Sequence, residues 1–367
     1  MKVLLQLPSV AQPVTMSVFM ETQQPYSLRQ ADADVLALAL ARSFNAAGIL
    51  TAFLSDALFN DDGPHVPIAE MQRLAGRALR FADDVPETRQ RLAHEQLTCI
   101  SRQALAEIVI HQPKLRLHYN DELGRISPDA TYESYEINPL YGLLFPRDHF
   151  INVGGQPVFG RLKRQDRARE VEVVKKVVTA HGHSLVELEQ LLEGGDYQEN
   201  EFVSVINVGF RTEEQTLHFL LASGLLKTNV VLAVQDTWRN PEQFHLDHYV
   251  CLLRDTLLID TRRADAIDRS KVSIYRRTPS GWRVTEENLT LRQAAQSADL
   301  KPILLDEKMM AAWCANAFSS GNHIWINNAA PSRLLDQLSA RGYDIHPISF
   351  SEHQKQSGGI HCSTQLI

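Results

Sequence analysis

Short runs of β-forming residues alternate with amphipathic helical segments through most of this chain. The runs that have the apolar and β-branched residues typical of strands lie at residues 3–7, 49–54, 157–162, 202–208, 230–234, 248–253, 303–305, 323–326 and 345–348. Because strands and helices are mixed rather than segregated, the pattern predicts an α/β fold. With 367 residues, of which 44% are hydrophobic, the chain can bury a large core.

Two of the expected helices have boundaries that can be read from the sequence. Thr212 and Gln215 have the spacing of a capping box, a leucine-rich face follows them, and Gly224 can end the helix. Residues 330–341 place leucines at helical spacing before Gly342.

Residues 67–118 depart from the alternation, because nearly all of this stretch has a helical pattern. Its segments AEMQRLAGRALRFA, PETRQRLAHEQL and SRQALAEIVIHQ place apolar residues three and four apart, with charged residues between them. No linker rich in Pro, Gly or Ser separates the stretch from its surroundings. The sequence therefore predicts one domain over residues 1–367, with a helical insertion at residues 67–118 packed on it.

Charge, hydropathy and cysteine pattern exclude several classes of protein. The formal net charge of −7, with no basic stretch, argues against a nucleic-acid-binding protein. No run of about 18 apolar residues exists, so we expect no membrane span. The opening residues MKVLLQL are better explained as a strand than as a signal peptide. Four cysteines without a CxxC pattern indicate neither a zinc cage nor a disulfide framework, which favours a reducing, cytoplasmic compartment.

Two motifs place carboxylates beside expected strands. In FPRDHF, at residues 145–150, Pro146 fixes the direction of the chain and Asp148 can point toward the end of the sheet. Taken alone, its Arg–Asp pair is also typical of a surface turn. In EGGD, at residues 193–196, two glycines between carboxylates allow close backbone approach to a ligand, although paired glycines are also common in loops.

A third motif, FHLDHY at residues 244–249, combines imidazoles with a carboxylate. If it opens a strand, side chains alternate and His245 and Asp247 share one face. Such a pair can carry a proton and bind a cation. The motif could also hold a metal, but no second histidine pair has ligand spacing, and we predict no metal site and no cofactor.

The fourth motif is GGIHC, whose Cys362 lies five residues before the last residue of the sequence. A cysteine nucleophile needs a thiolate and a partner that carries protons. In an extended segment His361 would point away from Cys362, so His245 is the more suitable partner. A buried, inert thiol is the alternative interpretation of this residue.

Carboxylates, one cysteine and one histidine suit a planar cation that is attacked at carbon. Carboxylates bind a guanidinium in a bidentate manner and fix its plane. The cysteine would add to the central carbon and the histidine would protonate the departing amine. This chemistry needs no metal and no redox cofactor.

FPRD, EGGD, HLD and GGxHC, in this order, resemble the guanidine-modifying enzymes of the pentein fold, and arginine deiminase most closely. The likeness covers about residues 139–362. NVGFRT after EGGD, DRARE after FPRD, and the arm VSIYRRTPSGWRVTEENLTLRQAAQ also resemble segments of arginine deiminases. The resemblance implies a pentein catalytic domain, a five-bladed pseudo-symmetric α/β propeller, with the helical insertion that this family contains.

The resemblance also implies roles for individual residues. Cys362 would form a covalent amidino adduct, His245 would act as general acid and base, and Glu193 would join it in the proton relay. The guanidinium would be bound by Asp148 and Asp247. The substrate's α-carboxylate would be bound by Arg211 and, less directly matched, Arg167.

The substrate and the second reactant stay open at this point. Arginine deiminases place an arginine where this chain has Ser357, and Lys355 is only a loose substitute. The ending GGIHCSTQ looks more like that of agmatine deiminases, whereas EGGD and the HLD arm favour arginine or a close derivative. Hydrolysis would give a ureido product of the citrulline type and ammonia, and an amidinotransferase that moves the group to an amine is the alternative. EGGD favours the hydrolase, which we expect to act on a small guanidino molecule, as a monomer or a homo-oligomer.

Overall fold

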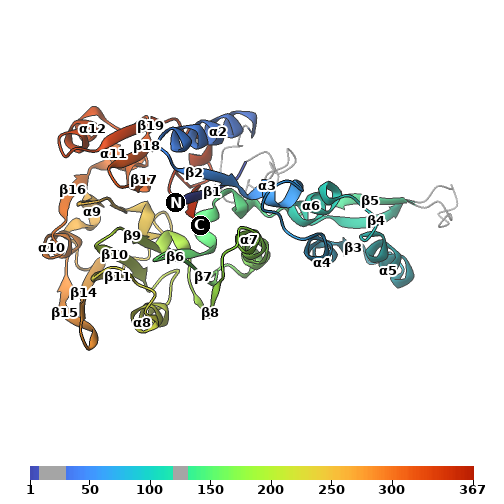
Figure 1. Ribbon diagram of the computed structural model, residues 1–367, viewed down its shortest axis with the longest axis horizontal. Helices are drawn as coiled ribbons and strands as arrows, with labels where there is room; N and C mark the ends of the chain where they lie inside the picture. The colour runs from blue at the N-terminus through green and yellow to red at the C-terminus, as the bar shows by residue number, and fades with distance from the viewer. Residues whose placement is uncertain (8–29, 119–130) are drawn as a thin grey trace.

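The computed structural model describes residues 1–7, 30–118 and 131–367, which form six sheets (Figure 1). The strands, sheet by sheet, are β1 (Lys2–Leu5), β2 (Leu50–Phe53) and β20 (Gln365–Leu366); β6 (Ile151–Val153), β7 (Gln156–Arg161) and β8 (Val186–Leu191); β9 (Tyr197–Glu199), β10 (Val203–Val208), β11 (Val230–Asp236), β14 (Ser270–Thr278) and β15 (Gly281–Leu289); β12 (Val250–Leu252), β13 (Thr256–Asp260) and β16 (Lys301–Leu305); β17 (Phe318–Ser320), β18 (His323–Asn327) and β19 (Asp344–Ile348); and β3 (Arg80–Phe81), β4 (Lys114–His118) and β5 (Thr131–Glu136).

The helices of the described residues lie between these strands. They are α2 (Gln30–Ala46), α3 (Leu54–Phe59), α4 (Ile68–Ala78), α5 (Glu87–Gln96), α6 (Arg102–His111), α7 (Ala168–Ala180), α8 (Glu214–Ser223), α9 (Thr261–Ala264), α10 (Leu291–Ser297), α11 (Glu307–Ala311), α12 (Ser332–Ser339) and α13 (Ser351–Gln354). Of these helices, none is long and apolar enough to cross a membrane.

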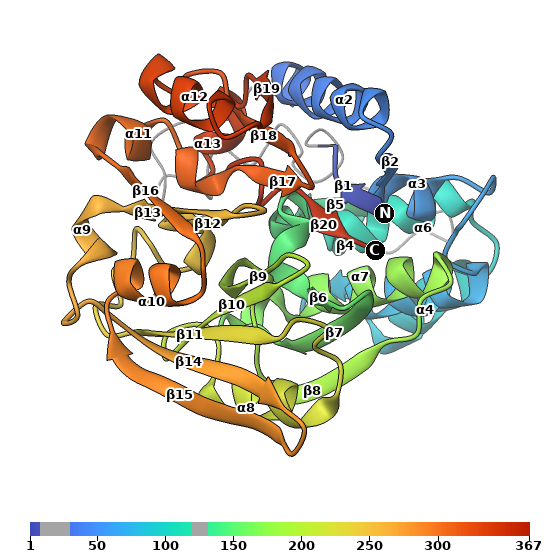
Figure 2. The same ribbon diagram turned by 60° about the vertical axis from the view of Figure 1, so that its left-hand side comes forward.

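Five of the sheets share one order of strand pairing. In each, two strands pair antiparallel, and a third strand pairs parallel with the second after a helical crossover. In the fifth sheet, β20 pairs antiparallel with β1, and α2 leads from β1 to the parallel strand β2. Figure 2 shows these five sheets following one another around the molecule. What the five units share is their strand pairing.

The mixed α/β prediction is confirmed, and each predicted strand run contains a strand. The leucine-rich helix faces also pack as expected, since Leu334 and Leu338 of α12 lie against Ile324 and Ile326 of β18 in a buried cluster. Burying such aliphatic side chains stabilises the fold by about 25 cal/mol per Å².

The predicted capping box before α8 is wrong. Glu213 is the N-cap residue and its side chain makes no capping hydrogen bond. The Thr212 hydroxyl instead donates to Asp196 at 2.9 Å and accepts the backbone N–H of Glu193 at 3.2 Å, so its oxygen bonds outside the helix. The end of the helix agrees with the prediction, since Gly224 has a left-handed conformation with φ of 73°.

Residues 67–118 form a projection at one side of the molecule (Figure 1). The structure contains α4, α5 and α6 there, but it also contains β3 and β4, so the stretch is less helical than expected. The sequence Lys114–His118 alternates charged and apolar residues, which is a strand pattern, and β4 pairs with β5 beyond the stretch. Helices α4 and α6 pack against α7, where Met71 and Val109 share a buried cluster with Val174.

Candidate active site

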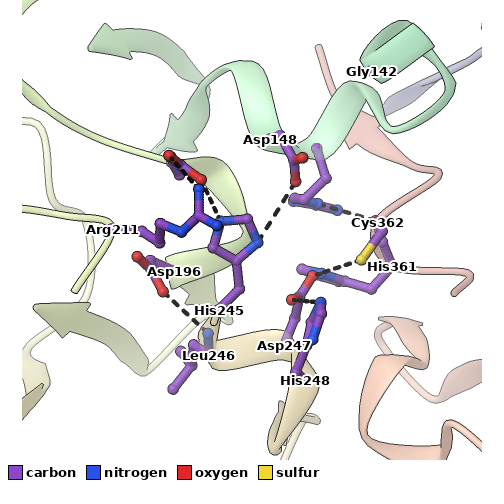
Figure 3. A network of polar contacts seen from close by, with 12 residues as sticks. Gly142, Asp148, Asp196, Arg211, His245, Leu246, Asp247, His248, His361 and Cys362 are labelled. Atoms are coloured by element: carbon purple, nitrogen blue, oxygen red, sulfur yellow. Dashed lines mark hydrogen bonds and ion pairs between the residues drawn. The ribbon is translucent and has the colours of Figure 1, made fainter. Parts of the chain in front are cut away.

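Short turns bring the polar residues of the predicted motifs together. The turns η4 (Pro146–His149), η6 (Gly194–Asp196), η7 (Leu246–His248) and η8 (Cys314–Asn316) directly precede the first strands of four sheets, β6, β9, β12 and β17. A turn around Cys362 precedes β20 in the same way. Figure 3 shows Asp148 and Asp247 on either side of the space between His245 and Cys362.

His245 and Glu193 form a fully buried pair. The Nε2 atom of His245 lies 2.7 Å from the Oε2 atom of Glu193. The other carboxylate oxygen accepts the backbone N–H of Lys163 at 2.8 Å and lies 3.4 Å from Arg211. These contacts fix the imidazole so that its Nδ1 faces Asp148, whose Oδ1 atom is 3.7 Å away.

Asp148 is held by a buried arginine. Arg167 donates from Nη1 to the Oδ2 atom of Asp148 at 2.9 Å and from Nε to Glu170 at 2.8 Å. Glu170 accepts the backbone N–H of Gly142 and lies 3.2 Å from His149. Arg167 therefore orients Asp148 and has contacts unlike those expected for an arginine that binds the substrate's carboxylate.

Asp247 contacts both residues at the end of the GGIHC motif. Its Oδ2 atom lies 2.8 Å from Nδ1 of His361 and 3.4 Å from Sγ of Cys362. The prediction that His361 points away from the site is wrong, because residues 360–363 form a turn and not a strand. The predicted strand at His245 and Asp247 is also wrong, since residues 246–248 form a 3₁₀ turn whose tighter geometry still brings both side chains to the centre.

Asn316 is a residue of the site that the sequence analysis missed. Its Nδ2 atom donates to Sγ of Cys362 at 3.1 Å and to the backbone oxygen of Asp247 at 3.0 Å. Its Oδ1 atom accepts the backbone N–H of Cys362 at 3.1 Å. Its place before β17 matches the place of the other motifs before their strands, but this strand was not predicted from the sequence.

The glycines of the motifs are required by close packing. A Cβ atom at Gly195 would lie 2.5 Å from Nδ1 of His245, and one at Gly194 would lie closer still to the backbone oxygen of Arg147. A Cβ atom at Gly359 would lie 2.6 Å from Oδ1 of Asn316. The close approach that we predicted for a ligand at EGGD is thus an approach to the protein's own His245.

Arg147 anchors the cysteine loop. Its guanidinium is buried and donates to the backbone oxygen of His361 at 3.3 Å and to the side chain of Gln365 at 3.0 Å. Burial lowers the pKa of Arg147 to about 10. The surface-turn interpretation of FPRD is therefore wrong, because the motif lies in the centre of the molecule.

Burial and the charges of the site raise the pKa of some of its residues and lower the pKa of others. Burial lowers the pKa of His245, but the bond to Glu193 and the charge of Asp148 raise it more, to about 9. Burial raises the pKa of Glu193, but His245 and the neighbouring arginines lower it to about 2. Burial and the charges of Asp247 and Asp148 raise the pKa of Cys362 well above its usual range. The resting site thus contains an imidazolium, ionised carboxylates and a neutral thiol.

Several buried polar atoms of the described site have no hydrogen-bond partner. They include Oδ1 of Asp247, Nδ1 of His245 and Nε2 of His248. Buried polar atoms are normally paired, so unpaired atoms that face one another indicate the place of a ligand. The possible metal-ligand atoms of His245, Asp247 and His248 lie within 4.8 Å of one another. The raised pKa of His245, however, keeps a proton on the nitrogen that would have to bind a metal ion. An organic cation fits this set better.

The residues considered for binding the substrate's α-carboxylate differ in their exposure and in their partners. Arg211 is partly exposed, lies 4.7 Å above the ring of Phe244, and has a buried Nε atom without a partner. Lys355 is paired with Glu352 at 2.8 Å. Ser357 is exposed at the surface end of the cysteine loop.

The fold is that of the pentein superfamily of guanidine-modifying enzymes. A family model described as arginine deiminase matches residues 68–309, which is well over half of the sequence. The chain belongs to the arginine deiminase family, and the resemblance inferred from its motifs is confirmed. It is accordingly a hydrolase of carbon–nitrogen bonds in amidines. No curated protein matches the sequence.

Solved structures support the fold. The N-terminal domain of ArgZ bound to its product, described as an arginine dihydrolase from the ornithine–ammonia cycle in cyanobacteria, has a TM-score of 0.58 at 13% identity, over 99% of this chain and 96% of that one. Unliganded AgrE has a TM-score of 0.58 at 13% sequence identity. The match covers 99% of this chain but 39% of that one. A DDAH variant from Pseudomonas aeruginosa complexed with citrulline has a TM-score of 0.56 at 14% sequence identity. The match covers 99% of this chain and 98% of that one.

Proposed function

We propose that this protein hydrolyses the guanidino group of arginine or a close derivative to a ureido product and ammonia. The observation that carries the proposal is the arrangement around Asp247, whose Oδ2 atom is 3.4 Å from the Cys362 sulfur while its Oδ1 atom is buried and unpaired. A guanidinium that donates to Oδ1 would place its central carbon beside the sulfur. Asp148, held by Arg167, would accept from the other side of the cation.

The charges suggest when the nucleophile forms. In the resting site the two aspartates hold Cys362 as a neutral thiol. A bound guanidinium would offset their charge, so the thiol would lose its proton to water only when substrate is present, and the thiolate would take a proton back from water after the product leaves. The thiolate would then add to the guanidinium carbon, and His245 would donate its proton to the departing nitrogen. Ammonia would leave, and an amidino group would stay bonded to the sulfur.

The second half of the reaction would use the same groups in reverse. Neutral His245 would take a proton from water, whose oxygen would add to the amidino carbon. The carbon–sulfur bond would then break, releasing the ureido product and the thiolate. Glu193 would stabilise the imidazolium in both halves through its 2.7 Å contact. The net reaction consumes one guanidinium and one water and forms a ureido group and ammonium.

The substrate end of the proposal rests on Arg211. Its unpaired Nε atom could bind a carboxylate, which favours arginine over agmatine. The pairing of Lys355 with Glu352 weakens the case for that lysine as a replacement for the family's arginine at Ser357. In this proposal Arg167 positions Asp148 and does not contact the substrate.

The five-bladed propeller remains part of the proposal. The five equivalent units and the turns that meet at the centre support a pseudo-symmetric arrangement with the site in its central channel. The cytoplasm is proposed as the compartment, because all four cysteines are free.

The test is incubation of the purified protein with arginine or agmatine, with and without glycine or ornithine as acceptor. Ammonia and a ureido product without any acceptor are expected. Turnover only with an amine acceptor would show an amidinotransferase instead. Cys362→Ala should abolish turnover while far-UV circular dichroism stays unchanged, and consumption of a guanidino substrate by this variant would contradict the mechanism.

A further inference from the structure

A second cluster of metal-ligating side chains lies on the sheet of β18 and β19, outside the site described above. His323 is the first residue of β18, and Asp344 and His346 belong to the parallel strand β19. His323 is the register partner of Asp344, and Trp325 is the partner of His346. Because side chains alternate along a strand, all of these residues stand on one face of the sheet. Figure 2 places this sheet beside α2, at the outside of the molecule.

The ligand atoms of the cluster surround one point. Nδ1 of His323 lies 3.0 Å from Nε2 of His346 and 3.1 Å from Oδ2 of Asp344, and the last two atoms are 3.5 Å apart. A tetrahedral zinc ion with bonds of about 2.0–2.1 Å requires its ligand atoms to be about 3.3 Å from one another. The three measured separations lie on both sides of that value.

Hydrogen bonding alone satisfies this cluster poorly. The carboxylate oxygen and the two imidazole nitrogens can each offer a lone pair to one point, whereas a single N–H on Nδ1 of His323 could point to only one of its two neighbours. A divalent cation would be bound by all three atoms at once. The chemistry of the set, two imidazoles and one carboxylate, is that of zinc and other late first-row metals rather than of calcium or magnesium.

The imidazoles are held in place by aromatic packing. The ring of His346 stacks on that of Trp325 at 4.7 Å with an interplanar angle of 14°. Trp325 is fully buried, packs against Phe44, and donates from its indole nitrogen to Ser43 of α2 at 2.9 Å. This support lowers the entropy cost of binding, whereas the exposed side chain of Asp344, at 61%, leaves a route to solvent.

We propose that His323, Asp344 and His346 form a binding site for a divalent transition-metal ion, Zn²⁺ in the first place. The ion ties the outer strand β19 to β18 and leaves a fourth coordination position to water. The site is independent of guanidine hydrolysis, since none of its residues belongs to the cluster around Cys362.

The test is calorimetric titration of the full chain with ZnCl₂, compared with His346→Gln and with His218→Gln, a control at an exposed histidine of α8. One ion per chain should bind to the wild type and to His218→Gln, and the affinity should fall at least about ten-fold in His346→Gln. Unchanged affinity in His346→Gln, or no binding to the wild type, would overturn the proposal.

Spectroscopy distinguishes this site from the catalytic cysteine and from a failure to fold. Co²⁺ bound by two imidazoles and a carboxylate should give visible d–d bands without the near-ultraviolet band of a cobalt–thiolate bond. Cu²⁺ should quench part of the tryptophan fluorescence, because Trp325 stacks on a ligand. Both signals should vanish in His346→Gln while circular dichroism is unchanged, and a thiolate band in the wild type would place the ion at a cysteine and contradict the proposal.

Discussion

The side chains around Cys362 show how one neutral thiol can be kept unreactive until a cation arrives. Desolvation and two nearby carboxylates disfavour the thiolate, and Asn316 is the neutral donor to the sulfur. A cysteine near a helix N-terminus or a histidine would instead be ionised at rest. In the proposed mechanism the site would therefore select for a positively charged substrate through its electrostatics.

His245 gives a pH prediction with a defined sign. Its pKa is about 9 in the folded protein and about 6.5 in an unfolded chain. A raised folded pKa contributes stability that is fully present below about pH 6.5 and is lost as pH rises through about 9. Urea denaturation of the wild type should therefore show the midpoint falling between pH 6.5 and 9.5 relative to His245→Gln. Parallel curves for the two proteins would contradict the raised pKa.

Asn316 gives a second prediction at this scale. Asn316→Ala removes the donor to Sγ and the acceptor for the backbone N–H of Cys362, so the sulfur loses its fixed position. One such hydrogen bond is worth about 1.4 kcal/mol, and kcat should fall about ten-fold or more with little change in KM. Steady-state kinetics check this, and Asn60→Ala at an exposed helix end is the control. A variant that raised only KM would indicate a role in binding.

At the scale of elements, the turns before the strands explain which parts of the site the sequence could reveal. FPRD, EGGD, HLD and GGIHC have distinctive composition, so these four motifs were identified from the residues and from the family resemblance, although HLD and GGIHC were expected to be extended and not turns. The turn that ends in Asn316 has no such composition, and its place becomes evident only when β17 is seen to be equivalent to β6, β9 and β12. The strand pairing of the five units is a property of the backbone, and the sequence does not repeat with it.

Contacts between elements were also beyond the sequence. The sequence analysis expected strand alternation to bring His245 and Asp247 together, whereas a 3₁₀ turn does so. Arg167 was assigned to the substrate because its own segment contains Glu170 but shows nothing of Asp148, which comes from a separate turn. Long-range ion pairs of this kind depend on how the elements pack.

The packing of η6 against η7 gives a prediction at this scale. Gly195→Ala would place a methyl group 2.5 Å from the His245 ring, whose pair with Glu193 leaves it little freedom to move. Activity should fall by about a hundred-fold or more, as measured with the preferred guanidino substrate. Gly76→Ala in the middle of α4 has room for its methyl group, and it should keep full activity and gain about 0.5–1 kcal/mol of stability. Equal activity in both variants would contradict the close packing of the EGGD turn.

At the scale of the whole molecule, the two ends of the chain form one sheet. Leu4 is the register partner of Gln365, and β1 also pairs with β2, so the last strand joins the first unit. The turn with Cys362 directly precedes this strand, so the position of Cys362 depends on the closure of this sheet by the pairing of β20 with β1. Each of the five sheets thus contributes the turn before its first strand to the same centre.

Gln365 connects that closure to the site, and its removal should weaken both. Its amide donates to the backbone oxygens of Arg147 at 3.2 Å and Phe150 at 2.5 Å, and its oxygen accepts from the Arg147 guanidinium at 3.0 Å. Gln365→Ala leaves these buried groups unpaired, so the free energy of unfolding should fall by about 2–4 kcal/mol.

In Gln365→Ala the Arg147 side chain, which anchors the loop that contains Cys362, would also lose one of its hydrogen-bond partners. The kcat should therefore fall even at urea concentrations far below those that unfold the variant. Gln296→Ala on the exposed face of α10 is the matched control, and it should change the free energy of unfolding by less than about 0.5 kcal/mol. Urea denaturation and steady-state kinetics on the same preparations separate the two effects. If Gln365→Ala lost stability but kept full kcat at 25 °C, closure of the fold and placement of the nucleophile would be independent.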